Sequence, residues 1–175
     1  MATGQVQMTK ELPRERFQML IERHRGIVLK VANTYARLPE DRRDLAQDIL
    51  AQAWKSFPAW DAGRPFSTWM YRVALNVAIS HARGSGNRDR HVAFDDDVEP
   101  LHDEDGVREA DDGIRVLYRC IARLDPFHRA LLLLYLDETS MREIAEILGL
   151  SETNVATKIA RLKLRIRNDI NPTGT

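Results

Sequence analysis

Residues 140–167 read SMREIAEILGLSETNVATKIARLKLRIR, and this stretch decides the fold of the C-terminal part of the chain. Ser140 and Glu143 have the spacing of a capping box at the start of a helix. Gly149 follows the last apolar residue of that helix, where helices often end in a left-handed residue. The apolar side chains at helical spacing between them are Met141, Ile144, Ala145 and Leu148. The stretch therefore predicts a first helix that is closed by a glycine turn.

A second helix is predicted to begin after Ser151, which is a suitable N-cap. Its apolar face, predicted to be buried, consists of Val155, Ile159, Leu162 and Ile166. The opposite face presents Asn154, Thr157 and Arg161, with Lys158 and Arg165 on its flank. Residues 153–168 include five basic residues and no acidic residue. The pattern is typical of a helix-turn-helix that enters the major groove of DNA, with a solvated face on a small helical bundle as the alternative.

The net charge of zero hides an uneven distribution of charge. Residues 95–112 contain ten acidic residues and a single basic one, Arg108. The rest of the chain has 25 basic and 16 acidic residues, which is a net charge of +9. Two basic blocks therefore lie on either side of an acidic stretch, and basic blocks suit a polyanionic partner such as a nucleic acid.

Composition also limits the class of protein. At 175 residues the chain can form one or two small domains. No run of eighteen apolar residues is present, so no membrane-spanning helix and no direct membrane insertion are predicted. The N-terminus lacks the apolar core of a signal peptide, and the single cysteine, Cys120, suits a reducing compartment and a role in helix packing. We therefore expect a cytoplasmic protein.

Nothing in the chain has the pattern of a catalytic or metal site. The five histidines are scattered, and none of them has metal-ligand spacing with a carboxylate partner. No glycine-rich phosphate loop is present. We therefore expect no enzyme activity, no catalytic residue, no metal, no cofactor and no small-molecule substrate.

Helical periodicity extends over the rest of the chain, and no strand-like alternation is found. Helices are predicted near 17–35, from Asp41 to Phe57, from Ser67 to Arg83, and from Pro126 after the N-cap Asp125. The predicted fold is all-α, with two small helical domains joined by a flexible acidic linker. The predicted bounds are 10–84 for the first domain, 85–112 for the linker and 113–171 for the second domain.

The helix that begins at Asp41 has an acidic stripe. Asp41, Asp44 and Asp48 lie within about 60° of one another on a helical wheel, together with Gln52. Leu45 and Trp54 border this stripe. The residues predicted to pack inside are Ala46, Ile49, Leu50 and Ala53. An acidic stripe bordered by large apolar side chains suits docking on a basic protein surface, and a solvated acidic face is the alternative.

Aromatic and basic residues alternate in the segment that follows. Residues 57–72 contain five aromatic residues, Phe57, Trp60, Phe66, Trp69 and Tyr71, together with the arginines Arg64 and Arg72. Rings that stack on bases, beside guanidinium groups that meet phosphates, are typical of single-strand binding. The alternative is that the aromatics form the core, most of all Phe66 and Trp69. Along the third helix, one polar stripe consists of Arg72, Asn76, Ser80 and Arg83.

Three segments in this order resemble the extracytoplasmic-function (ECF) sigma factors, which direct bacterial RNA polymerase to promoters. Residues 41–54, DRRDLAQDILAQAW, look like the family's second conserved region. Residues 57–83 look like its melting and −10 recognition segments, and residues 121–167 look like its −35-binding domain. The resemblance implies a promoter-specificity subunit with core RNA polymerase and promoter DNA as partners. It also implies an anti-sigma factor as a regulator.

The resemblance also implies roles for individual residues. Contacts to the clamp helices of the largest polymerase subunit would come from Asp41, Asp44, Leu45, Gln47, Asp48 and Trp54. The −10 strand, with one base flipped into the loop from Asp61 to Phe66, would be contacted by Phe57, Trp60, Asp61, Arg64, Phe66, Tyr71, Arg72, Asn76 and Arg83. The −35 duplex would be contacted by Ser151, Thr153, Asn154, Thr157, Lys158 and Arg161.

The chain departs from the family's pattern at three places. Residues 84–90, GSGNRDR, stand where many relatives have a denser basic tract. Ser80 stands where many relatives have an aspartate, and residues 138–139 are Glu-Thr where a glycine is common. An autonomous helix-turn-helix regulator is the alternative to a sigma factor. Such a regulator needs neither the acidic helix nor the aromatic segment, and these two features favour the sigma factor.

Overall fold

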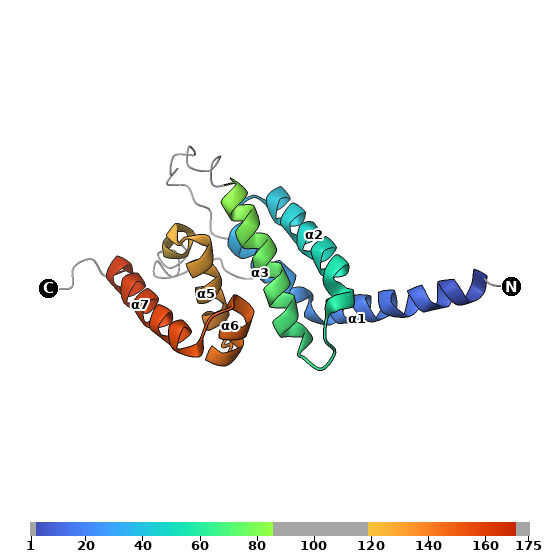
Figure 1. Cartoon of the computed structure of the whole chain (residues 1–175). Coiled ribbons are helices and arrows are strands. Elements are labelled where there is room, and N and C mark those ends of the chain that lie inside the picture. The colour runs from blue at the N-terminus through green and yellow to red at the C-terminus, as the bar shows by residue number, and fades with distance from the viewer. Residues whose placement is uncertain (1–2, 86–118, 171–175) are drawn as a thin grey trace. The chain divides into compact units, whose positions relative to one another are not determined.

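The computed structural model describes residues 3–85 and 119–170, and every element in these ranges is helical (Figure 1). The all-α prediction is therefore confirmed. The chain divides into two compact units, residues 1–78 and 79–175, and the division falls inside one helix. The predicted linker lies outside the described residues except for Ser85, and the three predicted domain bounds stay predictions.

The first unit contains α1 (Thr3–Tyr35), α2 (Pro39–Ser56), the short 3₁₀ helix η1 (Phe57–Ala59) and the start of α3 (Phe66–Ser85). α1 packs along α2, and fully buried side chains such as Val31, Ile49 and Met70 form the core. α1 begins well before Phe17, the first apolar residue that outlines the predicted helix, and its backbone leaves the helical conformation at His24 (φ −115°, ψ 15°). Apolar periodicity could not reveal its first turns, because residues 3–16 have no apolar stripe.

The second unit contains α5 (Pro126–Leu136), α6 (Met141–Leu148) and α7 (Glu152–Ile170). Its core is formed by fully buried side chains from all three helices, among them Leu131, Leu134, Ile144 and Val155. Cys120, in a short helical segment before α5, is also buried, as its predicted packing role requires. Burial raises the pKa of this thiol, and the carboxylate of Asp169 raises it further.

The predicted helix boundaries of the helix-turn-helix are confirmed. The Ser140 hydroxyl accepts the Glu143 N–H, and the Glu143 carboxylate accepts the Ser140 N–H, which completes the capping box. Gly149 ends α6 in the left-handed conformation (φ 68°, ψ 39°). The Ser151 hydroxyl then accepts the Asn154 N–H at 3.2 Å. The tight turn between α6 and α7 is thus fixed by its own local hydrogen bonds.

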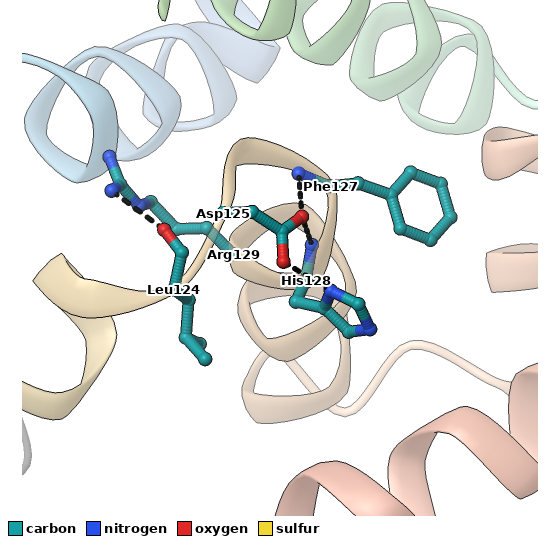
Figure 2. A network of polar contacts seen from close by, with 5 residues as sticks. All are labelled: Leu124, Asp125, Phe127, His128 and Arg129. Atoms are coloured by element: carbon teal, nitrogen blue, oxygen red, sulfur yellow. Dashed lines mark hydrogen bonds and ion pairs between the residues drawn. The ribbon is translucent and has the colours of Figure 1, made fainter. Parts of the chain in front are cut away.

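Asp125 caps the N-terminus of α5, as predicted (Figure 2). Its carboxylate accepts the backbone N–H groups of Phe127 and His128 and the Nδ1–H of the His128 ring, while the Phe127 ring points away. Partial burial raises the pKa of Asp125, but the hydrogen bonds from His128 and Phe127 outweigh it and lower the pKa below the ordinary 3.8. The folded state therefore favours the carboxylate.

A pH-dependent effect of this cap on stability is expected. Because the folded-state pKa is lowered, the stabilisation is fully present above the ordinary pKa of 3.8 and is lost as pH falls through the lower, folded-state value. Asp125→Ala should reduce the free energy of unfolding by about 0.5–2 kcal/mol at pH 7. Urea unfolding at a series of pH values should show this difference from wild type shrinking below pH 3.8. A difference in stability that is constant with pH would contradict the role of the charge. Asp125→Asn is the control variant, because it keeps a capping oxygen without that charge.

Glu138 adopts a positive φ of 56°. Its N–H donates to the Tyr135 carbonyl, and the Thr139 N–H donates to the Leu134 carbonyl, so the residue terminates α5. The left-handed conformation costs an L-residue roughly 1–2 kcal/mol. A glycine avoids this cost but loses about 0.5–1 kcal/mol of backbone entropy.

Glu138→Gly is therefore expected to stabilise the second unit by about 0.5 kcal/mol, the difference between these two effects. Thermal unfolding should show a rise in Tm of roughly 2–4 °C for this variant. Thr139→Gly is the matched control, because residue 139 has no positive φ and gains nothing from a glycine. An equal change in Tm for both variants would contradict the strain at Glu138.

Candidate nucleic-acid and protein interfaces

α2 presents an acidic face to solvent. Asp41, Asp44 and Asp48 are all exposed, as are Gln47 and Trp54, whose exposed fraction is 45%. No basic side chain in the described ranges pairs with these three carboxylates. The neighbouring Arg42 turns away to donate to the carbonyls of Ala36 and Arg37 at 3.1 and 2.9 Å. The acidic face, defined as Asp41, Asp44, Gln47, Asp48 and Trp54, is therefore free to attract a basic surface.

The prediction that Leu45 contributes to this face is wrong. Leu45 is fully buried together with Ile49 and Ala53, and these three side chains pack α2 into the core of the first unit. Ala46 and Leu50, which were predicted to lie inside, are only half-buried. The buried stripe thus shares Ile49 and Ala53 with the predicted one and is displaced towards Leu45. Leu45 holds the helix in place and is not available to a partner.

An aromatic cluster joins α1, η1 and α3. We define it as Phe17, Phe57, Trp60, Phe66 and Trp69. The Trp60 ring stacks on Phe57 with centroids 5.7 Å apart and meets Phe66 edge-on at 5.3 Å. Trp69 lies 5.1 Å from Phe66, and Phe17 lies 5.0 Å from both Phe57 and Trp54.

Burial rules out three of the predicted −10 contacts. Phe57, Phe66 and Tyr71 are buried, so they cannot stack on nucleic-acid bases in this conformation. The core interpretation is correct for Phe66, whereas Trp69 remains half-buried. Trp60 is also half-buried and stays a candidate for contact with DNA. Sequence alone could not separate these rings, because their packing depends on α1.

A preformed turn follows Trp60. The Asp61 carboxylate accepts the Gly63 N–H at 2.9 Å, and the Arg64 N–H donates to the Asp61 carbonyl at 3.0 Å. A Cβ atom at Gly63 would lie 3.2 Å from the Asp61 carboxylate, which favours glycine there. Residues 61–65 are all exposed, and the Arg64 Nε lies 3.9 Å from the Asp61 carboxylate. Asp61 and Arg64 are thus brought together on the surface.

α3 continues the candidate surface as a polar stripe. Arg72, Asn76, Ser80 and Arg83 are all exposed, at successive turns of the helix. The other side of α3 carries fully buried side chains such as Met70 and Ala74. The stripe therefore faces solvent, as predicted, and offers two guanidinium groups and an amide.

α7 is the candidate recognition helix. Its predicted core face is confirmed, because Val155, Ile159, Leu162 and Ile166 are all buried. The candidate DNA contacts that are exposed are Ser151, Thr153, Asn154, Thr157 and Arg161. Lys158 is half-buried, and its ammonium group lies 5.8 Å from the centroid of the Phe127 ring. This contact could not be predicted from helical periodicity, because Phe127 belongs to the first turn of another helix, α5.

No group of side chains suited to hold a metal is found in the described ranges. No described helix combines the length and the apolar character that crossing a bilayer requires.

Comparison with known proteins identifies both units. The family model for sigma-70 region 2 matches residues 20–88, and the model for sigma-70 region 4 matches residues 114–166. The chain is 23% identical to the ECF RNA polymerase sigma factor SigW of Bacillus subtilis, over 97% of both chains. It is also 23% identical to the ECF RNA polymerase sigma-E factor of Escherichia coli K12, over 89% of this chain and 87% of that protein.

Two solved structures have a similar fold. CnrH, solved in complex with the cytosolic domain of CnrY, gives a TM-score of 0.65 at 21% identity and covers 92% of this chain and 91% of its own. The sigma factor RpoE of Bartonella quintana, solved with the anti-sigma factor NepR, gives a TM-score of 0.63 at 16% identity and covers 93% of this chain and 98% of its own. Since the two family models together match most of the chain and its relatives align over nearly their whole length, the chain belongs to the sigma-70 family as an ECF RNA polymerase sigma factor.

Proposed function

We propose that this sigma factor holds core RNA polymerase through the acidic face of α2. The observation that supports this most directly is the set of three exposed carboxylates without basic partners in the described ranges, on a helix whose other side is buried. A rigid row of unpaired charges attracts an oppositely charged surface and fixes its register. The partner surface would be the clamp helices of the largest polymerase subunit. Trp54 would add apolar contact at the end of the row.

The first unit, together with the rest of α3, would also bind the −10 element as a single strand. The exposed turn at residues 61–65 would receive a flipped base, with Trp60 beside it. Other contacts would come from Asp61, Arg64, Arg72, Asn76 and Arg83. Unstacking a base costs a few kcal/mol, and stacking on protein returns about 1–3 kcal/mol per base, so strand opening needs no chemical fuel.

The second unit would read the −35 element as duplex. The residues of α7 that would enter the major groove are the exposed Asn154, Thr157 and Arg161 and the half-buried Lys158. Ser151 and Thr153 would lie against phosphates, which helix N-termini favour. The stacking of Lys158 on Phe127 would limit the positions that its ammonium group can reach.

Control by an anti-sigma factor is part of the proposal. Similar sigma factors have been solved with the cytosolic domain of CnrY and with the anti-sigma factor NepR. A protein that occupied the acidic face would compete with the polymerase. The sigma factor would work in the cytoplasm, where the polymerase acts, and it would contribute binding while the polymerase performs the chemistry.

Run-off transcription with purified core polymerase tests this function. We expect initiation from cognate promoters only when the sigma factor is added, and weak promoter binding by the isolated protein. The alternative, an autonomous helix-turn-helix regulator, requires tight binding to a palindromic duplex without polymerase. That result, together with no initiation, would overturn the proposed function.

Arg161→Ala tests the recognition helix. Arg161 is exposed on the face opposite the buried stripe, and an arginine that bonds a base edge provides about 1–3 kcal/mol of discrimination. Transcription from a −35-dependent promoter should fall by roughly fivefold to a hundredfold, and the preference for the base it contacts should relax. Arg167→Ala, an equal change in the last turn of α7, is the control. An unchanged promoter preference would mean that Arg161 does not contact the bases of the −35 element.

A further inference from the structure

Arg16 of α1 lies against the aromatic cluster, far in sequence from the turn at residues 61–65. Its guanidinium carbon is 5.2 Å from the centroid of the Trp60 ring, within the range of a cation–π contact. The side chain is exposed, and no carboxylate in the described ranges forms an ion pair with it. Among the described residues, Arg16 is therefore a cation without an acidic partner, and it lies on the surface over the Trp60 ring.

Neighbouring contacts fix this part of α1. Phe17 packs edge-on against Phe57 and Trp54 at 5.0 Å, and the His24 ring lies 5.1 Å from Phe66. The His24 Nδ1–H donates to the Leu20 carbonyl at 2.9 Å, at the break in the helix. α1 is thus attached to the aromatic cluster at Phe17, directly after Arg16, and again at His24, two turns further along the helix. The position of the guanidinium over Trp60 follows from this packing.

Stacking on a ring leaves the donors of a guanidinium group unused. The contact with Trp60 involves the flat face of the ring, whereas the five N–H donors of an arginine point outward in its own plane. Trp60 directly precedes the turn, where Arg64 already lies near the Asp61 carboxylate. Arg16 therefore adds a second guanidinium next to Trp60, and no carboxylate in the part of the chain that the structure describes pairs with it.

We propose that Arg16 binds a phosphate of the single-stranded −10 element next to the base that enters the turn. This inference rests on the proposed function and adds a contact from α1, an element to which no DNA contact is assigned above. Surfaces that bind single strands combine aromatic side chains with cations that follow the backbone, and Trp60 with Arg16 forms such a pair. The ring orients the guanidinium before the strand arrives.

The test uses holoenzyme bound to fork DNA with a single-stranded −10 element, titrated over a range of salt concentrations. Arg16→Gln should weaken binding by roughly twofold to fivefold, as the loss of an exposed ion pair does. The slope of log affinity against log salt should become shallower by about 0.7, the value for one phosphate contact on a single strand. Arg16→Lys should keep the slope, because it keeps the charge.

Arg14→Gln is the matched control, since Arg14 is an exposed arginine two residues away and is turned to another side of α1. Its slope should equal that of wild type. Neutral methylphosphonates should then replace the phosphates of the −10 strand one at a time. At one position the substitution should weaken binding by wild type and leave Arg16→Gln unaffected, which identifies the phosphate that Arg16 meets.

Several results would overturn the inference. One is a salt dependence of Arg16→Gln with the same slope as that of wild type. Another is that every methylphosphonate weakens binding by Arg16→Gln as much as it weakens binding by wild type. A third is a loss confined to the affinity for core polymerase or to the unfolding midpoint, which would make Arg16 a docking or structural residue. If wild-type holoenzyme itself fails to bind the fork, the proposed function fails, and this outcome is distinct from the other three.

Discussion

Asp48→Arg is expected to reduce the affinity for core RNA polymerase by roughly a hundredfold, which corresponds to about 2.7 kcal/mol. Asp48 is exposed in the acidic face, and no basic side chain in the described ranges neutralises it. Reversing its charge removes one attraction and places a cation against a surface that is proposed to be basic. Like charges brought together at an interface cost several kcal/mol. The expected loss of binding free energy is therefore larger than that from removing one exposed contact at the edge of an interface.

Titration of labelled core polymerase measures the effect, and Glu22→Arg is the control. Glu22 is an exposed acid on α1 of the same unit, so both variants change the net charge equally. Both should unfold at the wild-type temperature, because neither side chain is buried. Binding of isolated protein to −35 duplex should not decrease in either variant. Equal losses of polymerase affinity would mean that overall charge, and not the acidic face, drives docking.

Local features of this fold could be predicted from the sequence. The capping box at Ser140, the glycine turn at Gly149 and the N-cap at Asp125 all depend on residues that are close in the chain. The buried stripe of α7 follows from helical periodicity and is confirmed at all four positions. These features need no knowledge of what packs against them.

Features that depend on tertiary packing could not be predicted. Leu45 lies on the border between two faces of α2, and only the direction from which α1 packs decides that it is buried. Phe57 and Trp60 are three residues apart in an aromatic segment, yet Phe57 is buried, whereas Trp60 is half-buried and contacts the guanidinium group of Arg16 from α1. The contact between Arg16 and Trp60 has no local signal at all, because it joins distant parts of the chain.

The second large effect is expected for Leu134→Ala. Leu134 is fully buried in α5, in the same core as Ile144 and Val155. Truncating a buried leucine removes its transfer free energy and leaves a cavity, at a cost of about 3–5 kcal/mol. For a unit of this size the unfolding midpoint should fall by well over 10 °C. Leu136→Ala, the same substitution two residues later at a side chain that is 54% exposed, should change the free energy of unfolding by less than about 0.5 kcal/mol.

The functional effect of Leu134→Ala should distinguish the binding roles that are proposed for the two units. Leu134 belongs to the unit that contains α7, whereas the acidic face of α2 belongs to the other unit. Holoenzyme with Leu134→Ala should therefore keep its affinity for core polymerase and for fork DNA with a single-stranded −10 element. Transcription from a −35-dependent promoter should decrease sharply as temperature rises, because the helices that hold α7 unfold first. Unfolding around α7 should leave the carboxylates of α2 in place. If the affinity for core polymerase fell together with the transcription, the two units would not bind their partners independently, and this expectation would be wrong.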